Sequence, residues 1–153
     1  IEVAPADMPL DVFPGNPRYA KIARTLPKDV LLAALRVTGT HIHVGVGSMA
    51  EAIQAHNAFA DLITTFQHLG DHSNGERIRL YRSVSGDTPQ PRYADATHFY
   101  DHAVSAGFAD NPRNCWDLVR ISRHGTVELR MFGMTEDVDE TVSWAVSVLD
   151  TRP

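Results

Sequence analysis

The segment Val37–Val46 constrains the fold more than any other part of the chain, because its residue types alternate with the period of a β-strand. Successive side chains of a strand point to opposite faces of the sheet. The apolar positions are Ile42, Val44 and Val46, and the alternate positions are Gly39, His41, His43 and Gly45. We therefore predict a strand with one buried face and one face that carries only two imidazoles.

A second segment, near the end of the chain, has the same pattern. Cys115–Ser122 and Thr126–Phe132 predict a β-hairpin that turns at residues 123–125, an Arg-His-Gly run. We expect the apolar set of the second strand to face the core and the polar set to share the opposite face. These two sets are Val127, Leu129 and Met131, and Thr126, Glu128 and Arg130.

The rest of the chain has mainly helical patterns. Ser48 and Glu51 form a capping box at the start of a long predicted helix. The predicted helices are Arg18–Leu26, Ser48–Leu69, Ala94–Ala106 and Thr135–Leu149. Two further strands are predicted at Glu2–Ala4 and Arg77–Val84. The segment Val30–Leu35 fits either a helix or a strand. This mixed order favours the α+β class, with a largely antiparallel sheet and helices packed on one of its faces.

Length and composition narrow the class of protein. A chain of 153 residues has room for one hydrophobic core, so we predict a single domain over residues 1–153. A net charge of −5 without a basic stripe argues against a nucleic-acid partner, and no apolar run approaches a membrane span. One cysteine, Cys115, excludes an intrachain disulfide and fits a reducing compartment, so we expect a cytoplasmic protein. Self-association into a homo-oligomer stays open.

Four side chains on the two alternating strands are candidates for a metal–nucleotide site. His41 and His43 share one face of their strand, and neutral imidazole is a common metal ligand. The Glu128 carboxylate suits a hard cation such as Mg²⁺, and the Arg130 guanidinium suits phosphate oxygens. If both strands lie in one sheet, the four side chains converge on one patch. If each strand is considered alone, its polar residues fit a solvent-exposed face of the sheet equally well. This alternative stays open.

Other arginines are further candidates for holding an anion. Arg77, Arg79 and Arg82 form a basic cluster on one predicted strand, usable for phosphate or carboxylate or simply solvated. Arg120, on the first strand of the hairpin, could point to the same face as Glu128. In a chain of net charge −5, an anionic ligand needs such local cations.

Two ordered motifs resemble those of the glutamate–cysteine ligase-like carboxylate–amine ligases. Residues 38–46, Thr-Gly-Thr-His-Ile-His-Val-Gly-Val, resemble the G-x-H-x-H-V-G-V strand of this family. Residues 124–130, His-Gly-Thr-Val-Glu-Leu-Arg, resemble its G-T-V-E-x-R strand. Between them, Arg82 and the Trp116-Asp117 pair follow the order of the family, and Pro17-Arg18-Tyr19 is similar to an upstream R-Y.

This resemblance implies a fold and a reaction. The fold is a glutamine-synthetase-like sheet. The reaction is an ATP-dependent ligation in which a substrate carboxylate is phosphorylated and an amine then displaces phosphate, forming an amide of γ-glutamyl type. The implied ligands are ATP, Mg²⁺ or Mn²⁺, and a small-molecule amino acid and amine.

The resemblance also implies roles for residues of this chain. His41 and Glu128 would be metal ligands, and Arg130 would contact phosphate. The complete assignment is Arg130 and Glu128 as catalytic residues, Arg130, Arg82 and Arg79 for the nucleotide, His43 and Arg120 for the substrate, and His41 and Glu128 for the metal.

Two other functions stay open. Members of this family are longer and carry an early strand with several metal-binding glutamates, for which this sequence offers only Glu2. The chain is then a ligase, or a non-catalytic member that binds a nucleotide or amino acid, or one that needs a partner to complete its site. A metal hydrolase using His41, His43 and Glu128 is an unrelated alternative, and it leaves the wider motif match unexplained.

Overall fold

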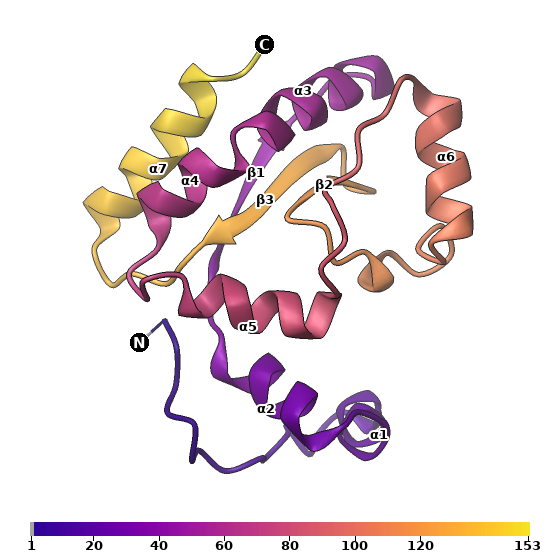
Figure 1. Cartoon of the computed structure of the whole chain (residues 1–153). Coiled ribbons are helices and arrows are strands. Elements are labelled where there is room, and N and C mark those ends of the chain that lie inside the picture. Colours follow the sequence, from indigo (N-terminus) through magenta and orange to yellow (C-terminus); the bar gives the residue numbers. More distant parts are fainter. Residues whose placement is uncertain (1) are drawn as a thin grey trace.

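The computed structural model describes residues 2–153 and has an α+β architecture (Figure 1). It contains three strands, seven α-helices and one short 3₁₀ helix, so the predicted class is confirmed. The strands are β1 (Thr40–Gly45), β2 (Val119–Ser122) and β3 (Thr126–Phe132). The helices are α1 (Pro17–Thr25), α2 (Lys28–Arg36), α3 (Met49–Asp61), α4 (Ile63–Gly70), α5 (Glu76–Ser85), α6 (Ala96–Ser105), η1 (Pro112–Asn114) and α7 (Val138–Asp150).

The three strands form one antiparallel sheet in the order β1-β3-β2. The hairpin of β2 and β3 turns at residues 123–125, as predicted, and β1 pairs with the other edge of β3. His43 lies opposite Glu128 in the first pairing and Arg120 lies opposite Glu128 in the second. The two motif-bearing strands are therefore neighbours. The glutamine-synthetase-like fold stays a prediction.

The hydrophobic core lies between the apolar face of the sheet and the helices α3, α4 and α7, which gather beside the sheet in Figure 1. The Phe132 ring of β3 stacks on Trp144 of α7 at 5.4 Å and meets Phe66 of α4 at 5.7 Å between centroids. The fully buried members of this core include Phe59, Val119, Val127, Leu129, Met131 and Val148. Among residues 2–153, no helix is both long and apolar enough to cross a membrane.

The predicted strand Arg77–Val84 is wrong, because this segment lies within helix α5. Gly75 precedes the helix with a φ of 81°, in the left-handed region where glycine is favoured. The buried side chains are Arg77, Ile78, Leu80 and Tyr81. Their spacing of one, three and four residues is that of a helical stripe, so packing against the core selected the helix over the alternating pattern.

Further boundaries differ from the predictions, and the first strand of the hairpin begins at Val119 instead of Cys115. The long predicted helix is broken at Leu62, whose backbone leaves the helical region with φ −104° and ψ 6° and whose N–H donates to the Phe59 carbonyl at 3.1 Å. Before β1, Val37 forms only an isolated antiparallel bridge with Val3. The ambiguous segment Val30–Leu35 lies within helix α2.

Replacement of Ser48 by alanine is expected to lower the free energy of unfolding by about 1 kcal/mol. The Ser48 hydroxyl accepts a hydrogen bond from the Glu51 N–H at 3.1 Å, and the Glu51 carboxylate accepts one from the Gly47 N–H at 2.7 Å. Loss of the hydroxyl leaves an N–H of the first turn without its side-chain partner. Urea denaturation of Ser48→Ala and of the parent measures this difference. An unchanged midpoint would contradict the capping role.

Candidate functional site

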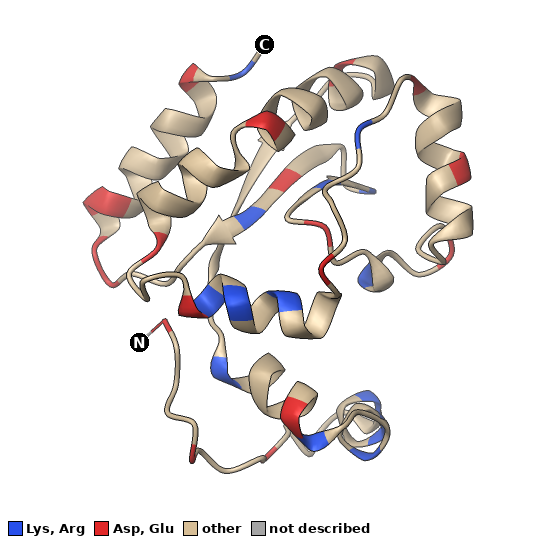
Figure 2. Ribbon diagram, viewed as in Figure 1, with Lys and Arg blue, Asp and Glu red and all other residues tan. Residues whose placement is uncertain are grey.

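The polar face of the sheet brings together side chains from all three strands. Because His43 and Arg120 lie opposite Glu128 from its two sides, these side chains project from the same face. His41 precedes His43 by two residues and Arg130 follows Glu128 by two, so both belong to this face as well. Figure 2 shows the adjacent acidic and basic positions of β3 at the centre of the sheet.

Glu128 is the centre of this group. Its carboxylate accepts a hydrogen bond from Arg120 Nε at 2.6 Å through Oε2. The other oxygen, Oε1, lies 3.0 Å from His41 Nδ1, 3.6 Å from Arg130 Nε and 4.0 Å from His43 Nε2. Glu128 is only 2% exposed, so a single buried carboxylate is surrounded by two guanidinium groups and two imidazoles.

The charge state of Glu128 follows from these contacts. Burial raises the pKa of a carboxyl group, because it penalises the charged form. Hydrogen bonds from His41 and Arg120 and the charges of Arg120 and Arg130 outweigh this effect and lower the pKa of Glu128 from 4.5 to about 2. Glu128 is therefore ionised at neutral pH, and with two arginines beside it the group has an excess of positive charge.

The segment that precedes β2 holds both arginines through hydrogen bonds to its main-chain carbonyl groups. Arg120 Nη1 donates to the carbonyl oxygens of Pro112 and Cys115 at 3.3 and 3.2 Å. Arg130 Nη1 donates to the same Cys115 carbonyl at 3.4 Å, and its guanidinium carbon lies 5.5 Å from the centroid of the Tyr81 ring. Contacts from several sides reduce the freedom of both side chains, which favours a preorganised site.

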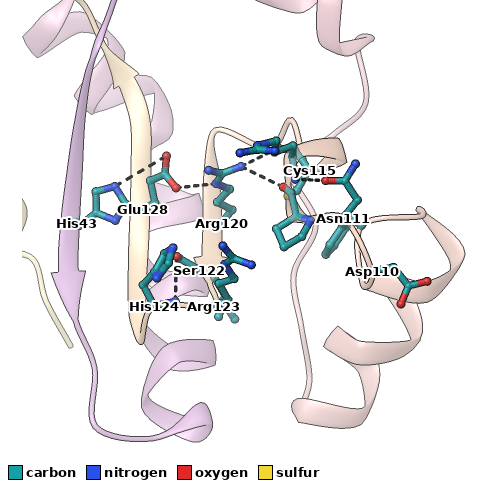
Figure 3. Close-up of a pocket in the computed structure, with 13 residues that line it drawn as sticks. His43, Asp110, Asn111, Cys115, Arg120, Ser122, Arg123, His124 and Glu128 are labelled. Carbon is teal, nitrogen blue, oxygen red and sulfur yellow. Dashed lines mark hydrogen bonds and ion pairs between the residues drawn. The ribbon is translucent and has the colours of Figure 1, made fainter. Parts of the chain in front are cut away.

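A cavity of about 440 Å³ opens beside this group (Figure 3). Figure 3 shows His43, Glu128 and Arg120 along one wall and Cys115 and Asn111 on the opposite loop. The charged residues of its lining are Asp110, Arg113, Arg120, Arg123 and Glu128. Three arginines against two carboxylates give the lining an excess of positive charge, so an anionic small molecule matches this cavity best.

His41 and Glu128 can supply part of a metal site. Their facing atoms are 3.0 Å apart, which suits two neighbouring ligands of an octahedral Mg²⁺ with bonds of about 2.1 Å. Among residues 2–153, however, no group of three or more His, Cys, Asp or Glu side chains is placed to hold a metal ion. The residues present therefore fit a metal whose other ligands are oxygens from elsewhere, such as those of a nucleotide.

Arg79 and Arg82 do not join this group. Both lie on helix α5, where Figure 2 shows several basic positions. Their side chains are 71% and 51% exposed and line another cavity, of about 890 Å³, together with Gln67 and Asp71. Their role in nucleotide binding stays a prediction, and the structure does not bring them to the polar face of the sheet.

Glu2 also lies away from Glu128. It is buried next to Gly133, just beyond the end of β3, and it accepts a hydrogen bond from the His72 N–H at 2.8 Å. Burial raises the pKa of Glu2 above its usual value of 4.5. Glu2 does not line the cavity at Glu128, so it adds no carboxylate to that group.

Four residues contribute to the site in ways that were not foreseen. The carbonyl groups of Pro112 and Cys115 hold Arg120, and Tyr81 lies under Arg130. Arg77 donates to main-chain carbonyls of β3. A helical interpretation of residues 76–85 would have placed Arg77 and Tyr81 on one face, because they are four residues apart.

Comparison with known proteins finds two relatives that this chain matches over part of their length. No family model matches the chain. The chain is 31% identical over 145 residues to a Rubrobacter xylanophilus protein named "Putative glutamate--cysteine ligase 2-3", an alignment that covers 86% of this chain and 39% of that protein. It is 30% identical over 109 residues to "Putative glutamate--cysteine ligase 2-1" of the same organism, covering 62% of this chain and 29% of that protein.

This similarity supports a glutamate–cysteine ligase-like relationship. The chain spans less than two fifths of the length of these two relatives.

Proposed function

We propose that this chain carries part of the active-site sheet of an ATP-dependent carboxylate–amine ligase, which forms an amide of γ-glutamyl type through an acyl phosphate. Three observations support the proposal. The two motifs resemble those of the family, two relatives carry glutamate–cysteine ligase names, and β1 and β3 are paired in one sheet. The partners in this proposal are ATP, an amino acid and an amine. With a single cysteine the chain does not depend on an oxidising compartment, so we propose the cytoplasm as its location.

One observation carries the proposal furthest. Glu128 is almost completely buried, and yet it is held ionised by Arg120, Arg130 and His41. Burying a charged group costs free energy unless the group is paired. The preorganised cations around this one carboxylate suit a site that binds phosphoryl groups.

The residues have distinct roles in this proposal. Glu128 and His41 would be ligands of a Mg²⁺ or Mn²⁺ ion, which would neutralise phosphate charge. Arg120 lines the cavity beside this carboxylate, Arg130 lies 3.6 Å from its Oε1, and both hold anionic groups of the nucleotide and the acid substrate. His43, which is hydrogen-bonded to the Thr126 hydroxyl at 3.0 Å, orients the substrate beside them.

Mg²⁺ with ADP or ATP is expected to raise the melting temperature of the protein. A ligand that binds only the folded state stabilises it by about 2.7 kcal/mol when its concentration is about 100 times Kd. The shift should shrink strongly in Arg130→Ala, because this variant loses a cation of the site. Differential scanning fluorimetry with Mg²⁺ alone, nucleotide with EDTA, and both together measures the effect.

The same measurement separates the proposal from its alternatives. Suppose that nucleotide raises the melting temperature but a phosphate assay detects no release with any acid and amine. This result favours a non-catalytic binding protein or one that needs a partner. No shift at millimolar nucleotide with metal contradicts a complete nucleotide site in this chain. A shift that is unchanged in Arg130→Ala and in Glu128→Gln would place nucleotide binding elsewhere.

A further inference from the structure

We propose that Arg77 is a positioning residue, which holds the main chain of β3 so that Arg130 reaches the site. The expected effect on ligand affinity rests on the proposed function. The position of Arg130 itself can be tested without any ligand.

The pairing of β1 and β3 is irregular beside the site. Thr40 pairs with Phe132 and Ile42 pairs with Leu129. Between these pairs a single residue of β1, His41, faces two residues of β3, Arg130 and Met131. This is a β-bulge, which re-aims side chains and leaves main-chain groups without their ladder partners.

Arg77 supplies hydrogen bonds at this bulge from helix α5. Its Nη1 donates to the Met131 carbonyl at 3.0 Å and its Nη2 donates to the Arg130 carbonyl at 3.1 Å. Its Nε donates to the Thr38 carbonyl at 2.7 Å, on the segment that leads into β1. One planar guanidinium therefore ties the two site strands together where their ladder is interrupted.

The same helix also contacts the Arg130 side chain. Tyr81 is four residues after Arg77, so both lie on one face of α5. The Tyr81 ring lies 5.5 Å from the Arg130 guanidinium carbon, and the Tyr81 hydroxyl donates to the Trp116 carbonyl at 2.6 Å. Helix α5 thus holds Arg130 twice, through its carbonyl and through its side chain, and Arg130 Nε stays 3.6 Å from Glu128 Oε1.

Stability alone does not explain Arg77. Its side chain is buried, with 3% exposed, and the charges of Glu2 and Asp71 act on it, but among residues 2–153 no carboxylate forms an ion pair with it within 4.0 Å. A buried cation without a direct ion pair is costly, and an apolar residue of similar volume is often as good for stability. Gly39 is adapted to this arrangement, since a Cβ atom there would collide with the Arg77 guanidinium. The geometry therefore fits a residue retained for the position of β3.

A double-mutant cycle tests this role through affinity. Arg77→Lys keeps the charge but loses the planar fork, and it is expected to weaken Mg²⁺–ADP binding roughly tenfold by calorimetry. In an Arg130→Ala background the same change should alter the affinity less than about twofold, because Arg77 acts through Arg130. Arg24→Lys, an exposed change on helix α1 in a residue with no assigned role, is the matched control and should change neither. An equal loss in both backgrounds, or a lower melting temperature with unchanged affinity, would overturn the proposal.

A ligand-free measurement keeps the test independent of the proposed function. Arg130 Nε is buried and has no hydrogen-bond partner among residues 2–153, so its N–H gives a distinctive NMR signal, which Arg130→Lys would assign. Arg77→Lys should shift this signal, and so should Gly39→Ala, whose Cβ atom would displace the Arg77 guanidinium, while Arg24→Lys should not. If the signal moves but no variant or parent binds nucleotide, the proposed function fails and the positioning role stands. If the signal is unchanged in both folded variants, the positioning role is wrong.

Discussion

Replacement of Arg130 by alanine is expected to slow ATP-dependent phosphate release about 10²–10³-fold, because a preorganised cation at a transferring phosphoryl group typically contributes that much to the rate. The cost should be large here because Arg130 is already fixed before any ligand binds. Its guanidinium lies near the Tyr81 ring and donates to the Cys115 carbonyl. A coupled phosphate assay with ATP, Mg²⁺, an amino acid and an amine measures the rate.

The control for this experiment is Arg24→Ala. Arg24 has the same charge, but it is exposed on helix α1 and has no assigned role, so the structure predicts little change. Comparable losses in Arg24→Ala and Arg130→Ala would refute the assignment of the site to the sheet face. A parent protein that releases no phosphate with a broad panel of acids and amines would favour the non-catalytic alternative.

Replacement of Glu128 by glutamine is expected to lower the free energy of unfolding by roughly 3 kcal/mol at pH 7. The folded state lowers the pKa of Glu128 from 4.5 to about 2. The ionised carboxylate is therefore more stable in the folded protein than in the unfolded chain. The variant loses this contribution and leaves Arg120 and Arg130 without their shared counter-ion.

The pH dependence of this difference has a definite direction. A carboxyl group with a lowered pKa in the folded state stabilises the protein fully above its unfolded pKa, and this stabilisation disappears as the pH falls to the folded pKa. The gap between the parent and Glu128→Gln should therefore be largest above about pH 5 and should close by about pH 2. Urea denaturation across this range measures it.

An exposed carboxylate provides the control for Glu128. Asp87 pairs with Arg82 at 3.8 Å, but its side chain is 87% exposed, so Asp87→Asn should change stability little at any pH. A gap between the parent and Glu128→Gln that stays constant from pH 7 to pH 2 would show that the carboxylate is not held ionised in the way described here.

Glu128 has a second role beside the metal-ligand role proposed for it. In the structure it neutralises Arg120 and Arg130, which would otherwise repel each other across the sheet. A carboxylate shared among Arg120, Arg130 and His41 can release one of these partners when a metal or an anion arrives. Ligand binding and the conformation of these side chains are then coupled, which the nucleotide and pH experiments measure from two directions.

Much of the sheet was accessible from the sequence. The alternation in Thr40–Gly45 and Thr126–Phe132 has a period of two, which no helix satisfies, so both strands and their polar faces could be predicted. The turn at residues 123–125 was equally clear from its glycine, which has a φ of 72° at Gly125. The convergence of His41, His43, Glu128 and Arg130 followed from these patterns once both strands were placed in one sheet.

The helical elements were less certain because their patterns were short. The residues of Arg77–Val84 alternate well enough to suggest a strand. Its helical stripe can be recognised only once the core that buries Ile78 and Tyr81 is known. The break at Leu62 is also invisible in the sequence, since the apolar residues on both sides continue one periodic pattern.

By itself, the sequence determined the two amphipathic strands, because the side chains of a strand alternate whatever surrounds it. It therefore determined which residues share the polar face: His41, His43, Glu128 and Arg130. Only the tertiary structure decided the order β1-β3-β2, the bulge opposite His41 and the contacts of Arg77 with its carbonyl groups. The pairing of β1 with β3 and the contacts of Arg77 join residues far apart in the chain, 53 positions in the case of Arg77 and Arg130, and no local pattern encodes such a contact.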